Sequence, residues 1–162
     1  MIRQLARIFA IVMLVGITGR AIAADRWETL QAIHMIENPR NSTRPGSHGE
    51  LGAYQFRHAT WRMHTRRPFQ LALNRAESDA VAAAHYEYLR DGLERSGVPA
   101  TTYNIAVAWN AGLDAAISGH APRASRNYAE RVVNLTRDTG RPNVGRQPVA
   151  ILAPMRPIVL TP

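Results

Sequence analysis

The chain has 162 residues, with 20 arginines, no lysine and 12 acidic residues, and its formal net charge is +8. This length is enough for one domain with its own core. The absence of cysteine excludes a disulfide scaffold and a lipid-modified cysteine anchor. The basic balance favours an anionic polymer as partner, although the base composition of the gene explains the exclusive use of arginine equally well.

The first 23 residues have the pattern of a secretory signal peptide. Arg3 and Arg7 precede an apolar run over residues 8–18, and residues 21–23 (AIA) provide the small residues of a cleavage site. The run is too short to span a bilayer comfortably. We therefore expect a periplasmic or secreted bacterial protein without a stable membrane anchor, whose mature chain has a formal charge of +5.

A first helix is expected to end at Glu37, with Asp25 as its N-cap. Leu30, Ile33 and Glu37 recur at helical spacing, which places the Glu37 carboxyl on the apolar face. Pro39 cannot continue the helix, so Glu37 lies on its last turn beside a loop. Partial desolvation there would raise its pKa, which suits a general acid acting on a glycosidic oxygen. An ordinary solvated acid near a helix end is the plainer interpretation of this residue alone.

The rest of the chain predicts one mainly α domain over residues 24–138. After a polar loop over residues 38–49, we expect a short helix over residues 53–63 and an irregular segment over residues 64–73. Longer helices are expected over residues 74–96, 102–111 and 124–137, with a linking segment through Pro122. Residues 139–162 hold five of the ten prolines and are expected to be an extended or disordered tail.

The three longer helices have predicted inward faces. Asn74 and Glu77 have the spacing of a capping box at the start of the longest helix, and Gly97 follows its end. The expected inward positions are Val81, Ala84 or His85, and Tyr88, then Ile105, Ala108 and Trp109, and finally Tyr128, Val132 and Leu135.

Four short motifs in this order resemble those of the lysozyme-like superfamily, specifically the soluble lytic murein transglycosylases. They are the apolar helix ending in Glu37, where the family has Glu-Ser, then GELGAYQ at residues 49–55, AWNAG at residues 108–112 and YAERV at residues 128–132. The last three are similar to Gly-Ala-x-Gly-Leu-Met-Gln, Ala-Tyr-Asn-Ala-Gly and Tyr-x-x-x-Val. The resemblance implies a mainly α, lysozyme-like (α+β) fold without disulfides. It also implies cleavage of the β-1,4 bond between N-acetylmuramic acid and N-acetylglucosamine in peptidoglycan.

The resemblance also implies roles for individual residues. Glu37 resembles the family's catalytic acid/base, and Tyr128 resembles a tyrosine that lies close to it. Gln55 and Asn110 resemble side chains that line the glycan cleft, where an amide can both donate to and accept from a sugar. Tyr54 would offer a flat face to a pyranose ring. Trp61 and Trp109 are open to the same interpretation or to a place in the core, and for Trp109 the core is favoured.

The chain departs from the family pattern at Asn38, Glu50, Tyr54 and Trp109. Glu50 adds a second carboxyl and leaves two mechanisms open. Acting alone, Glu37 would protonate the leaving oxygen and then deprotonate the sugar's C6 hydroxyl, which gives a 1,6-anhydro product. With a partner, Glu50 would activate water or stabilise the oxocarbenium ion, which gives hydrolysis. A structural loop acid bound to backbone N–H groups is an equal alternative for Glu50.

Other function classes have less support in the sequence. His34 and Glu37 have metal-ligand spacing but lack a third ligand, so neither a metal nor another cofactor is expected. Dispersed arginines and the export signal argue against nucleic acid as partner. We expect a monomer that acts on peptidoglycan strands. A non-catalytic glycan-binding or envelope-assembly protein on the same scaffold is the alternative, supported by the departures at Asn38 and Tyr54.

Overall fold

The computed structural model describes residues 26–139. The predicted signal peptide, the Asp25 N-cap and the tail beyond Thr139 lie outside these residues. Over the described range the chain is mainly helical, as predicted, and an isolated antiparallel β-bridge joins Leu51 to Phe56. Within the same range no helix is both long enough and apolar enough to cross a membrane.

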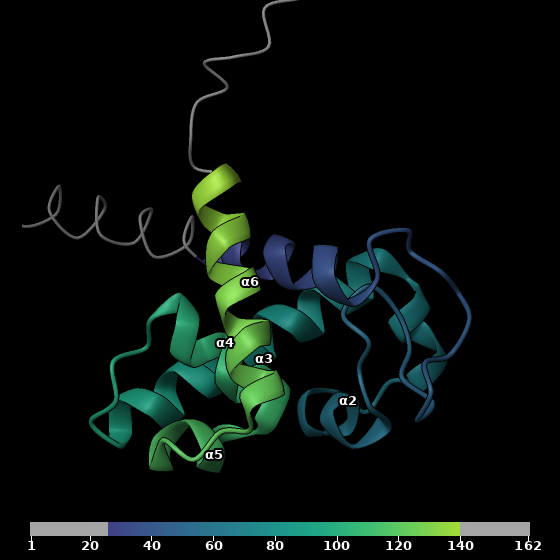
Figure 1. The fold of residues 1–162 in the computed structure, drawn as a ribbon. Coiled ribbons are helices and arrows are strands. Elements are labelled where there is room, and N and C mark those ends of the chain that lie inside the picture. The colour runs from purple at the N-terminus through teal and green to yellow at the C-terminus, as the bar shows by residue number, and fades with distance from the viewer. Residues whose placement is uncertain (1–25, 140–162) are drawn as a thin grey trace, which may run out of the picture.

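The helices pack around one hydrophobic core of the described residues, and Figure 1 shows how they are arranged. They are the first helix over residues 26–37, α2 (His58–His64), a 3-10 helix η1 (Phe69–Leu73), α3 (Arg75–Arg95), α4 (Thr102–Ala111), α5 (Leu113–Ser118) and α6 (Arg123–Thr139). The hydrophobic helix α4 lies at the centre and packs most extensively against α6, which crosses in front of it in Figure 1. It also contacts α3 and α5, so α4 is covered on several sides.

The predicted cap of α3 is confirmed, and α4 has a cap of the same kind. The side chain of Asn74 accepts a hydrogen bond from the backbone N–H of Glu77 at 3.1 Å, and that of Thr101 accepts from the N–H of Asn104 at 3.2 Å. Each bond satisfies a backbone donor that the first turn of a helix leaves free. Gly97, with a φ of +71°, follows α3 in the left-handed conformation that commonly ends a helix.

The predicted helix over residues 53–63 is wrong in its first half. Leu51 and Phe56 exchange two backbone hydrogen bonds, of 3.0 Å and 2.9 Å, which close a tight turn over the residues between them. Gly52 and Gln55 have φ values of +81° and +47°, which no right-handed helix contains. The turn chemistry of the glycine therefore overrides the local helical pattern, and α2 begins only at His58.

Two short helices were not predicted. The 3-10 helix η1 lies in a segment expected to be irregular, and α5 lies in the segment expected to link the last two helices. Both are shorter than two helical turns, so neither shows a hydrophobic period that a sequence pattern could display. Gly112 and Gly119, at positive φ, flank α5.

The predicted inward face of α3 is partly wrong. Val81 and His85 are buried as expected, but Ala84 and Tyr88 are exposed. The buried positions of α3 are Ser78, Val81, Ala82, His85, Tyr86, Leu89, Gly92 and Leu93. The buried face of α3 is wide because four other helices pack on it, namely η1, α2, α4 and α5. In α6, Tyr128 and Val132 are buried and Leu135 is partly buried, in agreement with the predicted face.

Candidate active site

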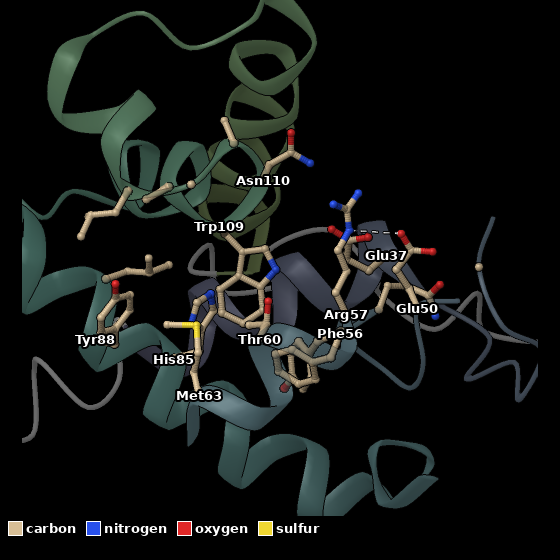
Figure 2. A pocket seen from close by; sticks show the side chains of 18 of the residues that line it. Glu37, Glu50, Phe56, Arg57, Thr60, Met63, His85, Tyr88, Trp109 and Asn110 are labelled. Atoms are coloured by element: carbon tan, nitrogen blue, oxygen red, sulfur yellow. Dashed lines mark ion pairs between the residues drawn. The ribbon is translucent and has the colours of Figure 1, made fainter. Parts of the chain in front are cut away.

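A cleft of about 670 Å³ opens beside the end of the first helix (Figure 2). Its polar lining residues include Ser47, Gln55 and Asn110. Figure 2 shows Glu37, Glu50 and Arg57 together at one end, which is the polar end of the cleft. The same figure shows Met63, His85 and Tyr88 at the other end and Trp109 between the two ends. Leu89 and Leu113 also line the cleft. The cleft therefore brings together five of the residues singled out from the sequence: Glu37, Glu50, Tyr54, Gln55 and Asn110.

Glu37 occupies the last turn of the first helix and is partly buried. Burial raises the pKa of its carboxyl, and the negative charge of Glu50 raises it further. The neighbouring Tyr128 hydroxyl and the positive charge of Arg131 act in the opposite direction, but the pKa remains above its ordinary value. The direction predicted from the position of Glu37 is thus confirmed, and the carboxyl retains its proton to a higher pH than a solvated glutamate does.

Tyr128 reaches Glu37 from α6, although it is not among the residues that line the cleft. Its hydroxyl is buried and, within the described residues, has no hydrogen-bond partner inside 3.5 Å. Yet the influence of each group on the pKa of the other shows that the phenol and the carboxyl are neighbours. Burial and the charge of Glu37 raise the pKa of Tyr128 well above 10, so its O–H is a permanent donor. The Tyr128 hydroxyl is therefore a donor beside the Glu37 carboxyl, although the two groups do not form a hydrogen bond in the structure.

The surroundings of Glu50 lower the pKa of its carboxyl, whereas those of Glu37 raise it. Its side chain is 14 % exposed and accepts a hydrogen bond from the backbone N–H of His48 at 2.9 Å. Its own backbone N–H and that of His48 are the main causes that lower its pKa, and the nearby His48 and Arg57 side chains lower it further. Glu50 is therefore ionised at neutral pH. The two carboxyls of the cleft have pKa values shifted apart, an arrangement typical of acid and base pairs.

Asn38, which stands where the resembling family has serine, organises the loop behind the acid. Its side chain is buried, and Nδ2 donates to the carbonyls of Ser42 at 2.9 Å and Gly52 at 3.1 Å. Its Oδ1 accepts from the N–H of Ser42 at 2.8 Å. One amide thus joins the end of the first helix to the polar loop and to the turn that carries Gln55, which a serine hydroxyl is too short to do.

Gln55 and Glu50 share a space that Gly46 leaves open. A Cβ at position 46 would lie 2.5 Å from Glu50 Oε2 and 2.8 Å from Gln55 Oε1, so any larger residue would displace both side chains. Gln55 holds a left-handed φ of +47° and donates from Nε2 to the carbonyl of Gly52 at 3.0 Å. The sequence alone did not single out Gly46, because one glycine in a Pro- and Gly-containing loop carries no distinguishing pattern.

Two of the candidate aromatic platforms are almost fully buried. Trp61 is 0 % exposed, which confirms the interpretation of it as core. Tyr54 is 1 % exposed, and its ring lies 5.8 Å and 6.0 Å, between ring centres, from Phe56 and Trp109. Tyr54 therefore forms part of the cleft wall and offers little of its face. Trp109 is partly buried and lines the cleft, so it belongs both to the core and to the site.

Several cleft residues were missed or misplaced in the sequence analysis: Arg57, Thr60, Met63, His85 and Tyr88. His85 is buried, and its Nδ1 lies 2.9 Å from Nε2 of His64. Burial and the neighbouring His64 lower its pKa to about 4, so His85 is uncharged at neutral pH. The helical spacing of His85 and Tyr88 predicted that both lie on one face of α3. We interpreted that face as part of the core, whereas part of it lines the cleft.

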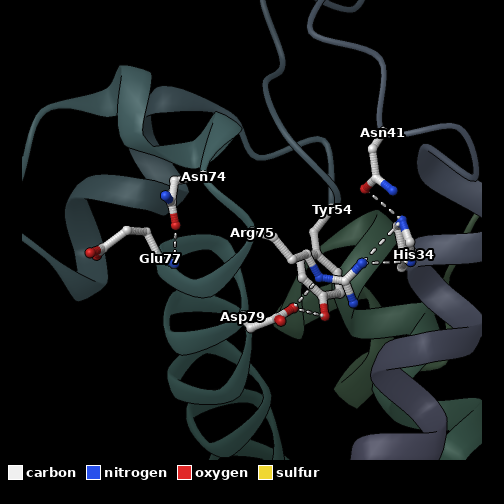
Figure 3. A network of polar contacts seen from close by, with 7 residues as sticks. All are labelled: His34, Asn41, Tyr54, Asn74, Arg75, Glu77 and Asp79. Atoms are coloured by element: carbon white, nitrogen blue, oxygen red, sulfur yellow. Dashed lines mark hydrogen bonds and ion pairs between the residues drawn. The ribbon is translucent and has the colours of Figure 1, made fainter.

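A polar network behind Tyr54 fixes the cleft wall to α3 (Figure 3). The Tyr54 hydroxyl donates to Asp79 at 2.7 Å, and Arg75 Nε donates to the same carboxylate at 2.8 Å. Arg75 Nη1 also lies 3.2 Å from Nδ1 of His34, whose Nε2 bonds to Oδ1 of Asn41 at 3.0 Å. Since Asn41 accepts, His34 carries its proton on Nε2 and uses Nδ1 as the acceptor. The network joins the first helix, the loop and the turn to α3.

Over residues 26–139 no group of three or more His, Cys, Asp or Glu side chains is placed to hold a metal ion. Comparisons with protein-family models, with curated proteins and with solved structures find no match to the chain.

Proposed function

We propose that this chain is an exported, lysozyme-like glycosidase that cleaves the β-1,4 bond between N-acetylmuramic acid and N-acetylglucosamine in peptidoglycan. The observation that carries the proposal is the Glu37 carboxyl, which has a raised pKa and lies at the edge of a cleft of about 670 Å³. The amides of Gln55 and Asn110 line the same cleft. Three of the four motifs of the lysozyme-like pattern contribute these residues in the expected order, and the fourth contributes Tyr128.

In the proposed mechanism Glu37 is the general acid and then the general base. Protonated Glu37 donates to the glycosidic oxygen as the bond to the leaving sugar breaks. The resulting carboxylate is stabilised by a hydrogen bond from the Tyr128 hydroxyl and by the charge of Arg131, the two groups that already lower its pKa. The carboxylate then takes a proton from the attacking group, which is either the C6 hydroxyl of the same sugar or a water molecule.

Glu50 is better suited to stabilise charge than to act as a base. Backbone N–H groups, His48 and Arg57 hold its pKa below the ordinary value, and a lower pKa makes a weaker base. An ionised carboxylate in the same cleft does favour the positive charge that develops on the sugar ring. We therefore assign both proton transfers to Glu37 and electrostatic stabilisation of the oxocarbenium ion to Glu50.

The test is the release of soluble fragments from purified peptidoglycan by the wild-type protein and by Glu37→Gln. We expect the variant to lose activity by about 100- to 10,000-fold, the usual contribution of a general acid and base. Glu130→Gln is the matched control, because Glu130 is an exposed glutamate on α6 outside the cleft. Full activity of Glu37→Gln would remove Glu37 from its role.

Two further readouts separate the remaining alternatives. Mass spectrometry of the fragments distinguishes 1,6-anhydro ends from reducing ends, and so identifies the attacking group. Sedimentation of the protein with insoluble peptidoglycan, without release of fragments, would instead indicate a glycan-binding protein on this scaffold.

A further inference from the structure

Arg57 is the one arginine among the described residues that line the cleft. Its backbone is fixed, because it follows the bridge at Phe56 and is the N-cap residue of α2, where its carbonyl accepts from the N–H of Trp61 at 3.0 Å. The base of the side chain is thus anchored, while the side chain itself is 67 % exposed. Figure 2 shows the guanidinium at the polar end of the cleft, near Glu37 and Glu50.

The ion pair that Arg57 makes leaves much of its guanidinium unused. Nε lies 3.5 Å from Glu50 Oε1, whereas Glu50 takes its shorter bond, of 2.9 Å, from the His48 backbone. Over residues 26–139 Arg57 has no other ion pair with a protein side chain. A guanidinium has five N–H donors in a planar fork, and the two Nη groups match a carboxylate in a bidentate arrangement.

A neutral sugar chain offers nothing that needs such a cation. The amides of Gln55 and Asn110, which line the cleft, suit hydroxyl and acetamido groups, since an amide both donates and accepts. In peptidoglycan, however, the muramic acid carries a lactyl group, either free as a carboxylate or extended by a peptide with carboxylates of its own. If Glu37 protonates the bond at the muramic acid, an arginine beside Glu37 lies next to the sugar that carries this substituent.

We propose that Arg57 is a specificity-determining residue that binds a carboxylate on the substituent of the muramic acid, so that the cleft prefers anionic glycans to neutral ones. The inference rests on the proposed function, because the anion must lie next to the bond that Glu37 protonates. The carboxylate belongs to the free lactyl group or to the stem peptide, and the choice of substrates below distinguishes these two sources.

The experiment compares kcat/KM on three soluble substrates: muropeptide oligomers with intact stem peptides, the same glycan stripped of peptide to leave the lactyl carboxylate, and neutral N-acetylglucosamine oligomers. We expect Arg57→Gln to lower the ratio of anionic to neutral kcat/KM by about 10-fold or more, and Arg57→Lys to lower it less, because lysine keeps the charge but loses the fork. A loss confined to stripped glycan identifies the lactyl carboxylate, and a loss confined to intact muropeptides identifies the peptide.

The ratio of kcat/KM on anionic substrates to that on neutral substrates separates recognition of the substrate from an effect of Arg57 on Glu50. If Arg57 only holds Glu50 in place, Arg57→Gln lowers kcat/KM equally on all three substrates, and the proposal is overturned. Arg62→Gln is the control for net charge, because Arg62 is an exposed arginine on the same helix α2 and does not line the cleft. This control should leave the ratio unchanged.

Binding supplies a second measurement that does not need catalysis. In the Glu37→Gln background, Arg57→Gln should weaken the affinity for the anionic glycans about 10-fold and leave the affinity for neutral oligomers unchanged. Equal affinities with and without Arg57 would overturn the inference while leaving the glycosidase proposal standing. If the wild-type protein neither binds nor cleaves any of the three substrates, the proposed function itself is overturned, and the proposed selectivity with it.

Discussion

Glu37 and Glu50 line one cleft, but their pKa values are shifted in opposite directions. Glu37 lies on the last turn of a helix, and burial is the chief cause that raises its pKa. Glu50 lies in a loop, and hydrogen bonds from backbone N–H groups are the chief cause that lowers its pKa. The negative charge of Glu50 also raises the pKa of Glu37. Burial of Glu37, with a smaller effect from the charge of Glu50, and the backbone N–H groups at Glu50 therefore move the two pKa values apart, which favours the protonated form of one acid and the ionised form of the other.

The first prediction concerns the pH dependence of kcat/KM. Activity requires Glu50 ionised and Glu37 protonated, so it should rise through the lowered pKa of Glu50 and fall through the raised pKa of Glu37. In Glu50→Gln the charge that raises the pKa of Glu37 is gone. The alkaline limb of the profile should therefore move to lower pH, in addition to any loss of rate. An alkaline limb that does not move would show that it reports another group.

The second prediction concerns Tyr128→Phe. The hydroxyl lowers the pKa of Glu37, so its removal should move the alkaline limb to higher pH, the direction opposite to that of Glu50→Gln. Activity should fall, because the carboxylate formed after proton transfer loses a donor. The free energy of unfolding should change by less than about 1 kcal/mol, since the buried hydroxyl has no partner inside 3.5 Å within the described residues. Urea denaturation measures this, and a large destabilisation would indicate a stronger bond than the geometry shows.

The sequence predicted the parts of the site that depend on regular structure. The end of the first helix at Glu37, the cap at Asn74 and the end of α4 at Gly112 each follow from local rules of helix termination, and the structure agrees with them. The raised pKa of Glu37 followed because an acid on an apolar face is desolvated wherever that face packs.

The parts that depend on the packing of distant segments could not be predicted. Tyr88 was expected to face the core, but the face of α3 is shared between the core and the cleft, and only the placement of α2 and α5 decides the boundary. Likewise, Arg57 and Gly46 acquire their roles from the turn over residues 51–56. One left-handed glutamine and one glycine define that turn, and a helical pattern obscured it in the sequence.

The third prediction concerns backbone strain at Gln55. A left-handed φ costs a non-glycine residue about 1–2 kcal/mol, and glycine removes this cost. We expect Gln55→Gly to be more stable than Gln55→Ala by about 1 kcal/mol in urea denaturation. Both variants should lose activity, because both lack the amide that faces the cleft. A glycine variant as unstable as the alanine variant would mean that the conformation at position 55 has relaxed.

The fourth prediction concerns the close contact at Gly52. A Cβ there would lie 1.8 Å from the backbone carbonyl oxygen of Ala72, and φ is +81°. Gly52→Ala should therefore destabilise the protein by about 3–5 kcal/mol, through both overpacking and backbone strain. Gly119→Ala is the control. It has a similar φ of +71° with nothing within 4 Å of the added Cβ, so it should cost only about 1 kcal/mol. Equal losses would show that strain alone accounts for both.

The last prediction concerns stability in acid. Burial lowers the pKa of His85 from its ordinary value of 6.5 to about 4, so the unfolded chain takes up a proton at pH values where the folded protein does not. The stability that His85 contributes is complete above pH 6.5 and is lost as the pH falls towards 4, with a loss of about 2 kcal/mol at pH 5. Urea denaturation at pH 7.5 and pH 5 measures this difference.

The difference in stability between the two pH values should shrink in His85→Gln, whose uncharged side chain does not titrate. It should persist in the control His120→Gln, which changes an exposed histidine after α5. His64, whose pKa burial also lowers, adds to the same acid limb, so His85→Gln should reduce the difference without abolishing it. An unchanged difference in His85→Gln would show that His85 is protonated in the folded protein as readily as in the unfolded chain.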